Sequence, residues 1–153
     1  MRILMTLLLF MGLVTFGQAQ LILSEEDGLY YNQNGELYTG TYVELYPSGN
    51  KRVEMKVVEG NKQGISTYYF DNKLTQGIRS YDKNKMDGLW ETWNEEGVKL
   101  GVASYKKGVK HGEWKIFDEN GTLRYDMLYV KGKKSGVWKI YDEKGKLTSK
   151  KEF

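Results

Sequence analysis

The chain has 153 residues, of which 28% are charged and 40% hydrophobic, and its formal net charge is +3. This length and composition fit a single globular domain and exclude a disordered tail or a bundle of membrane helices; so small a net charge gives no reason to expect nucleic acid as a partner. Cys is absent, which excludes a disulfide framework, a thiolate zinc site, a thiol nucleophile and the acylated cysteine of a bacterial lipoprotein.

The first 19 residues are typical of a secretory signal peptide. Arg2 provides a positive charge, residues 3–16 form an apolar run, and Gly17 and Ala19 are the small residues expected before a cleavage site. A run of 14 residues is shorter than the about 18 that a membrane-spanning helix needs. We therefore expect residues 1–19 to be removed and the protein to be exported to the periplasm, the outer envelope or the medium.

Residues 20–39 are expected to form a partial repeat that caps the N-terminal end. Gly28 and Gly35 punctuate short aromatic and polar stretches that resemble a shortened hairpin. The spacing departs from the pattern that follows, which is usual for a terminal repeat because it must close the stack.

From residue 40 onward the chain repeats with a period of 24 residues, as several independent columns show. The glycines that begin the units are Gly40, Gly64, Gly88, Gly112 and Gly136. The aromatic columns are Tyr42, Trp90, Trp114 and Trp138, with Ser66 as the exception; Tyr69, Trp93, Phe117 and Tyr141; and Tyr81, Tyr105, Tyr129 and Phe153. We therefore divide residues 40–153 into units that begin near these five glycines.

Each unit is predicted to be a β-hairpin. In the unit that begins at Gly112, residues 113–117 form a first strand and residues 118–121 form a tight turn that ends in glycine. Residues 123–129 alternate between apolar and polar side chains, as a half-buried strand does. The frequent glycines argue against helices. The sequence thus predicts an all-β fold, an antiparallel β-meander of 24-residue hairpin repeats that forms an elongated, twisted sheet.

Residues 105–123 resemble the bacterial variant of the MORN repeat, and residues 129–147 repeat the pattern. The matching positions are Tyr105, Gly108, Gly112, Trp114, Phe117 and Gly121 in the first segment, with Trp138 and Tyr141 in the second. The resemblance implies a β-repeat fold without shared catalytic residues. It also implies a binding role, because MORN repeats are linked to scaffolding and to phospholipid, and proteins of this variant are described as antitoxin-like.

No motif indicates an enzyme, a cofactor or a metal site. His111 is the one histidine of the chain, so it cannot form a His-His zinc site, and we expect it to be an exposed loop residue. The acidic pairs in the turns lack the spacing of a calcium-binding loop. We therefore expect no catalytic, cofactor-binding or metal-binding residues.

The predicted hairpins separate charge along the two long edges of the sheet. The turns within the units carry mostly Asp and Glu, and the connections between units carry lysines. Such a basic edge fits an anionic lipid headgroup, lipopolysaccharide or an acidic protein; the simpler account is that these sequences make good turns and were duplicated. The candidate edge consists of Lys62, Lys83, Lys85, Lys106, Lys107, Lys110, Lys131, Lys133 and Lys134.

The tryptophan column provides a second candidate site, the aromatic face of Trp90, Trp114 and Trp138. Stacked aromatic rings hold sugar rings or peptide strands. They also stabilise a thin sheet, since each cross-strand aromatic pair contributes about 0.2–1 kcal/mol. We favour the structural role and keep the binding face as the alternative.

These patterns favour a non-enzymatic, exported repeat protein that acts as a binding or scaffolding module in the cell envelope. Its partner would be a protein or an anionic envelope component. The alternative is an antitoxin-like inhibitor that binds one protein in fixed stoichiometry. Export discriminates between the two, because a cytoplasmic antitoxin does not lose a signal peptide.

Overall fold

The computed structural model describes residues 21–153, so the signal peptide expected at residues 1–19 lies outside the described part. The described residues form strands and turns. The strands are β1 (Ile22–Leu23), β2 (Tyr30–Tyr31), β3 (Gly40–Leu45), β4 (Lys51–Val58), β5 (Asn61–Tyr69), β6 (Thr75–Asp82), β7 (Lys85–Trp93), β8 (Lys99–Lys106), β9 (Val109–Lys110), β10 (Gly112–Phe117), β11 (Leu123–Val130), β12 (Lys133–Tyr141) and β13 (Leu147–Glu152). Within this part of the chain there is no helix of the length and hydrophobicity needed to cross a membrane.

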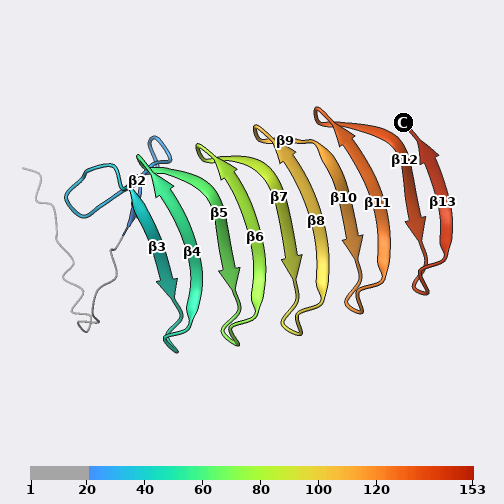
Figure 1. Ribbon diagram of the computed structural model, residues 1–153, viewed down its shortest axis with the longest axis horizontal. Helices are drawn as coiled ribbons and strands as arrows, with labels where there is room; N and C mark the ends of the chain where they lie inside the picture. Colours follow the sequence, from blue (N-terminus) through green and yellow to red (C-terminus); the bar gives the residue numbers. More distant parts are fainter. Residues whose placement is uncertain (1–20) are drawn as a thin grey trace, which may run out of the picture.

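Strands β3 to β13 form one antiparallel sheet of 11 strands, in which each strand pairs with its neighbours along the chain. The short strand β9 pairs with β8 beside the main path. Figure 1 shows the strands side by side along the long axis, with the hairpin turns gathered at two opposite edges. The predicted all-β meander of hairpin repeats is therefore confirmed.

Two-residue turns connect one unit to the next. Both residues of each turn have a positive φ, which is the backbone conformation of a type I′ hairpin turn. The four turns are Glu59–Gly60, Lys83–Asn84, Lys107–Gly108 and Lys131–Gly132. They are shorter than the connections expected from the sequence, because the residues that follow each turn already belong to the next strand.

In the last three units an aspartate or asparagine side chain holds the turn within the unit. Asp118 Oδ1 accepts hydrogen bonds from the backbone N–H groups of Thr122 (2.9 Å) and Asn120 (3.1 Å). These donors lower the pKa of Asp118, the Thr122 N–H most of all. Asn94 and Asp142 hold their own turns in the same way. One side chain thus fixes each of these three turns, which the sequence predicted from their glycines.

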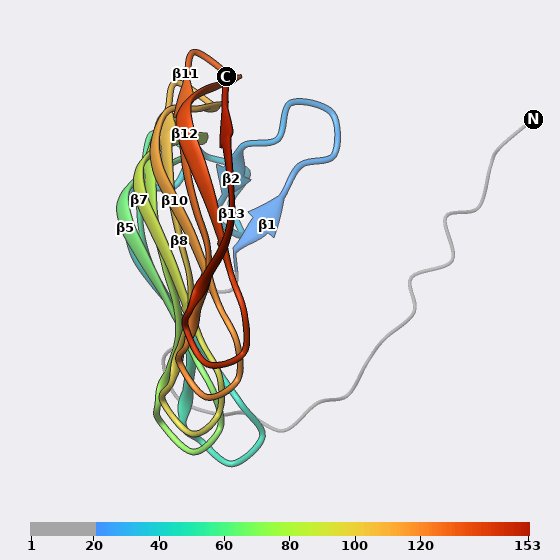
Figure 2. The ribbon, with the colours of Figure 1, turned by 90° about the vertical axis from the view of Figure 1, so that its right-hand side faces the viewer.

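The sheet is a single layer, and its small core lies at the N-terminal end. Val53, Met55 and Val57 of β4 are buried in one cluster. Leu21 and Tyr30 pack against this cluster from one side of the sheet, where Figure 2 shows β1 and β2. Residues 21–39 thus cover one face of the sheet instead of extending it, an arrangement that the sequence did not reveal.

Hydrogen bonds from two turns attach this N-terminal cap, residues 21–39, to the sheet. The Tyr30 N–H donates to the Gly60 carbonyl at 2.8 Å, and the Asn84 side-chain amide donates to the Gly28 carbonyl at 3.3 Å. Asn84 occupies the column that holds glycine at 60, 108 and 132. Its side chain therefore explains why this turn departs from the glycine pattern.

Lys73 occupies a turn position that strains its backbone. Its φ is 71°, and the equivalent residue is a glycine in every other hairpin of the sheet. A left-handed conformation costs a residue with a side chain about 1 kcal/mol relative to glycine. We expect Lys73→Gly to raise the free energy of unfolding by about 0.5–1 kcal/mol in urea denaturation. Lys144→Gly is the matched control, since Lys144 lies in another of these turns without a positive φ. A lower free energy of unfolding in Lys73→Gly would contradict the assignment of backbone strain to Lys73.

Candidate functional site on the aromatic face

Seven aromatic rings form one continuous ladder across the sheet from β6 to the residue after β13. Neighbouring ring centroids are 4.9–5.3 Å apart, and the ring planes are tilted by 54–66°. The rings are, in order, Tyr81, Trp90, Tyr105, Trp114, Tyr129, Trp138 and Phe153. The tryptophan column and one tyrosine column, which are separate in the sequence, alternate in this ladder because their strands are neighbours. We call this side of the sheet the aromatic face.

The polar edge of each tryptophan is satisfied by the neighbouring strand. The indole N–H groups of Trp90, Trp114 and Trp138 each donate to a backbone carbonyl at 3.0 Å. The acceptors are Ser80, Ser104 and Leu128. These bonds fix the ring orientations, which supports the structural role expected of the column. The outer ring surfaces stay partly accessible, since all three side chains are only half-buried.

Three of the nine candidate lysines lie on the aromatic face. The Lys110 ammonium group is 4.2 Å from the Trp114 ring centroid and 4.8 Å from that of Tyr129. Lys134 has the same position one unit later, 4.5 Å from Trp138 and 4.8 Å from the last ring of the ladder. Cations at these distances are attracted by the electron-rich ring faces.

Lys62, the third, lies over a ring of the cap as well as a ring of the sheet. Its ammonium group is 5.2 Å from the Tyr81 centroid and 5.6 Å from the Tyr30 centroid. Lys62, Lys110 and Lys134 are separated by multiples of 24 residues, so they hold equivalent places. The sequence could not place them on a face, because the expected connections between units were too long.

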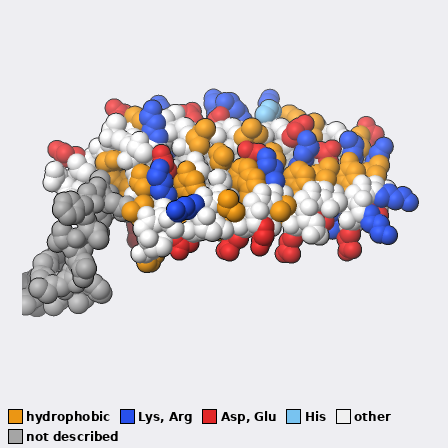
Figure 3. Space-filling model, turned by 60° about the horizontal axis from the view of Figure 1, so that its bottom comes forward, with side chains coloured by type: hydrophobic (Ala, Val, Ile, Leu, Met, Phe, Trp, Pro, Cys, Tyr) orange, Lys and Arg blue, Asp and Glu red, His pale blue; other side chains and the backbone are white. Residues whose placement is uncertain are grey.

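The other six lysines lie at or beside the turns between units, and we call them the basic edge. They are Lys83, Lys85, Lys106, Lys107, Lys131 and Lys133. Figure 3 shows a row of carboxylates along the opposite long edge, with a band of hydrophobic side chains between the edges. Asp87 is an acidic residue within the basic edge. It accepts from the Lys106 ammonium group at 2.9 Å and from the Lys107 N–H at 3.0 Å, and these donors lower its pKa.

His111 has a structural partner. Its Nδ1 accepts a hydrogen bond from the backbone N–H of Lys131, the first residue of the next turn between units, at 3.3 Å. Thr39, Gln63 and Asp87 occupy the equivalent position in earlier units and accept the equivalent N–H at 2.8, 3.0 and 3.0 Å. The exposed histidine therefore belongs to a column of turn-holding side chains.

An arginine replaces the missing tryptophan of the second unit. Ser66 stands in the tryptophan column and is paired across the strands with Arg79. The Arg79 guanidinium carbon lies 4.1 Å from the Tyr68 centroid and 5.3 Å from the Trp90 centroid, so a cation continues the stack. Burial, together with the neighbouring Tyr68, raises the pKa of Tyr81 to about 12.

The aromatic face contains an open hollow of about 390 Å³ over β10 to β13, which we call the C-terminal hollow. Its lining residues are Ile116, Tyr125, Met127, Lys134, Trp138, Lys139, Ile140, Lys151 and Phe153. The lining is mostly apolar and includes three lysines but no carboxylate. Lys139 forms an ion pair with Asp126 at 3.4 Å, whereas the Lys134 and Lys151 ammonium groups lie over the Phe153 ring at 4.8 and 5.1 Å from its centroid.

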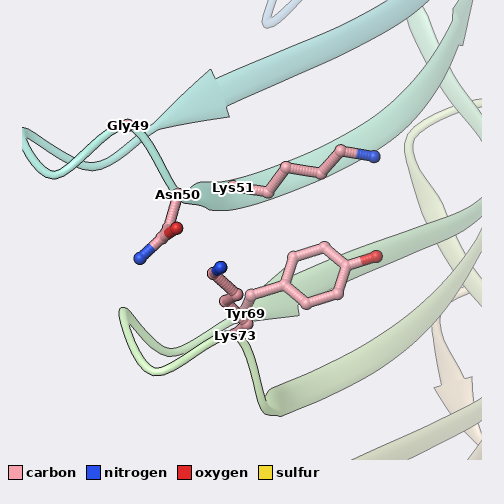
Figure 4. Close-up of a pocket in the computed structure, with 5 residues that line it drawn as sticks. All are labelled: Gly49, Asn50, Lys51, Tyr69 and Lys73. Atoms are coloured by element: carbon pink, nitrogen blue, oxygen red, sulfur yellow. The ribbon is translucent and has the colours of Figure 1, made fainter.

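A second hollow of similar size lies between the turns of the first two units, at the long edge opposite the basic edge. Figure 4 shows Lys51 and Tyr69 running side by side, with Asn50 and Lys73 contributed by the neighbouring turns. Lys51 is already paired with Glu54 at 2.6 Å. The lining has no acid, histidine or hydroxyl nucleophile beyond the tyrosine, and among residues 21–153 no group of three or more potential ligands could hold a metal ion.

The opposite face of the sheet carries an apolar column that the sequence reading missed. Ile65, Leu89 and Val137 are 61%, 53% and 44% exposed, and each follows a glycine that begins a unit. Their common period of 24 residues was the available signal. Both faces of the sheet therefore present hydrophobic side chains to solvent.

Comparison with known families identifies the repeat. Residues 110–131 and 134–153 match the family model for the MORN repeat variant. The C-terminal segment, residues 110–153, therefore contains two MORN-variant repeats. The comparison with curated proteins finds no match. The two matched segments contain Trp114 and Trp138, so the MORN-variant units include the C-terminal hollow.

The ladder of the MORN-variant units should show measurable coupling between adjacent rings. Trp114 and Tyr129 are in contact, with centroids 5.3 Å apart. We expect a double-mutant cycle of Trp114→Ala and Tyr129→Ala to give a coupling of about 0.5–1.5 kcal/mol in the free energy of unfolding. Trp90→Ala with Tyr129→Ala is the control, because these rings do not touch and their effects should add. Additivity in both pairs would show that the rings act independently.

Tyr81 should make the protein less stable at high pH. Its pKa is about 12 in the folded chain and near 10 when unfolded, so between these values the unfolded chain binds fewer protons. The free energy of unfolding should therefore fall as the pH rises from 10 to 12. Urea denaturation at several pH values should show a shallower fall for Tyr81→Phe, whereas an identical fall would assign the effect to other groups.

Proposed function

We propose that the protein is an exported, non-catalytic binding or scaffolding module of the cell envelope. The observation that carries the proposal is the single-layer sheet, whose described residues bury only Val53, Met55, Val57, Met127 and Ser66 among the larger side chains. A sheet without a second layer leaves both faces available to partners. Large exposed hydrophobic patches usually mark interaction sites.

The charge of the sheet favours an anionic partner. Residues 40–153 contain 22 Lys and Arg against 16 Asp and Glu. Six of the lysines lie on the basic edge, where their combined field attracts acidic proteins or anionic headgroups over several ångströms. Arg2, the apolar run at residues 3–16 and Ala19 support export by their resemblance to a signal peptide.

The experiment combines cell fractionation with a charge variant. Intact mass spectrometry of the protein from its native host should find a chain beginning at Gln20 in the envelope fraction or the medium. Purified protein should bind anionic vesicles or lipopolysaccharide in low salt, and Lys→Gln substitution of the whole basic edge should weaken that binding at least tenfold.

Lys→Arg substitution at the same six positions is the matched control, because it keeps the charge and should keep the binding. Equal binding by the Gln variant and the natural chain would remove the basic edge from the function. An uncleaved chain in the cytoplasm, bound in fixed stoichiometry to one protein, would overturn the envelope role and favour an antitoxin-like inhibitor.

A further inference from the structure

The N-terminal cap provides an internal example of a segment bound to the aromatic face. Residues 21–39 contain four carboxylates and no Lys or Arg, so they are opposite in charge to the sheet. Tyr30 lies 5.6 Å from the Lys62 ammonium group, and its N–H donates to the Gly60 carbonyl at 2.8 Å. Leu21 and Tyr30 both pack against the buried cluster of Val53, Met55 and Val57. The face therefore holds an acidic, hairpin-like segment through an aromatic side chain, a lysine and a turn carbonyl.

The C-terminal hollow is formed by residues equivalent to those beneath the cap, three repeat units later in the chain. Adding 72 residues converts the sheet residues beneath the cap into their counterparts near the hollow. Tyr42, Val53, Met55, Val57, Lys62 and Tyr68 correspond to Trp114, Tyr125, Met127, Tyr129, Lys134 and Ile140. Four of these counterparts line the hollow, and the methionine is buried in both places, at 5% and 9% exposure.

The intermediate units lack this arrangement of sheet residues, which we call a seat. At the position of Val53 they have Gly77 and Gly101, and at the position of Met55 they have Arg79 and Ala103. Glycine and alanine offer little surface to a bound side chain, and the arginine is engaged with two rings of the sheet. Only the last units restore a large apolar residue beside a lysine.

The charges at the hollow select an acidic ligand. The sheet residues beneath the cap include Glu44, whose counterpart in the hollow is Ile116. The hollow therefore keeps a lysine, Lys134 in place of Lys62, gains Lys151 and loses the carboxylate. A second copy placed face to face would bring these lysines against each other, which disfavours a symmetric dimer here. An acidic segment would neutralise them.

We propose that the C-terminal hollow binds an acidic peptide segment of a partner protein. An aromatic side chain of that segment occupies the place beside Lys134 that Tyr30 occupies beside Lys62, and its backbone N–H donates to the Gly132 carbonyl, the counterpart of Gly60. The inference rests on the proposed binding function and adds the face and the chemistry of the ligand.

The test uses a fluorescent peptide with the sequence of residues 21–39 as the probe. Titration of the full chain, followed by fluorescence anisotropy, should show saturable binding that weakens with salt. The Lys134→Gln, Lys151→Gln double variant should bind at least tenfold more weakly. The matched control is Lys144→Gln with Lys150→Gln, which removes the same charge from the same hairpin away from the hollow and should leave the affinity unchanged. A probe with Tyr30→Ala should also bind at least tenfold more weakly.

Three results would overturn the inference. Equal loss in both double variants would mean unspecific attraction between charges. Loss of peptide binding in Lys62→Gln but not in the Lys134→Gln, Lys151→Gln variant would mean that the probe displaces the cap and binds in its place. Binding of polygalacturonate at Lys134 and Lys151 without binding of the peptide would identify an acidic glycan as the ligand. Each result is independent of the vesicle assay on the basic edge, so the proposed function stands or fails separately.

Discussion

Lateral contact between rings on adjacent strands takes the place of a second layer in this fold. A single sheet cannot bury its side chains against an opposing sheet or helix, so they must bury surface against their neighbours in the same sheet. Trp114, between Tyr105 and Tyr129, does so on both sides while its indole N–H is held by the strand before it. The turns between units reinforce the stacking, because the first residue of each turn donates its backbone N–H to the side chain of Thr39, Gln63, Asp87 or His111. Every stabilising contact of the repeats is therefore a contact between neighbours.

The repeats tolerate exceptions only where another group restores the lateral contact. Ser66 leaves a gap in the tryptophan column, and Arg79 fills it with a cation stacked on Tyr68. In the first unit Val57 stands in the tyrosine column, and the cap packs against the cluster that contains it. The unusual residues of the first two units thus replace ring contacts that the later units have. They are the reason that these units depart from the repeat pattern in sequence.

The sequence was sufficient for the fold because period, turn glycines and alternation are local properties that repeat. It was insufficient for the site because face and distance depend on register. The two-residue turns carry Lys110 and Lys134 onto strands, over the rings, where the longer connections expected from the sequence would have left them at an edge. The pairing of Ile22 with Tyr31 had no periodic signal, and the hollow became visible only when the cap was seen on the equivalent face.

The seat at the cap and the seat at the C-terminal hollow are separated by a whole number of repeat units, so the number of seats can change as units are gained or lost in evolution. Gain or loss of a 24-residue unit after the turn at Asn84 leaves the remaining strand pairs in register, because strand pairing joins adjacent hairpins and the cap is bonded to the turns at Gly60 and Asn84. At the positions of Tyr125 and Met127 the preceding unit has Gly101 and Ala103, while it already has Lys110 at the position of Lys134. Valency, the number of segments that one molecule gathers, is therefore set by unit composition and can change without any change in architecture.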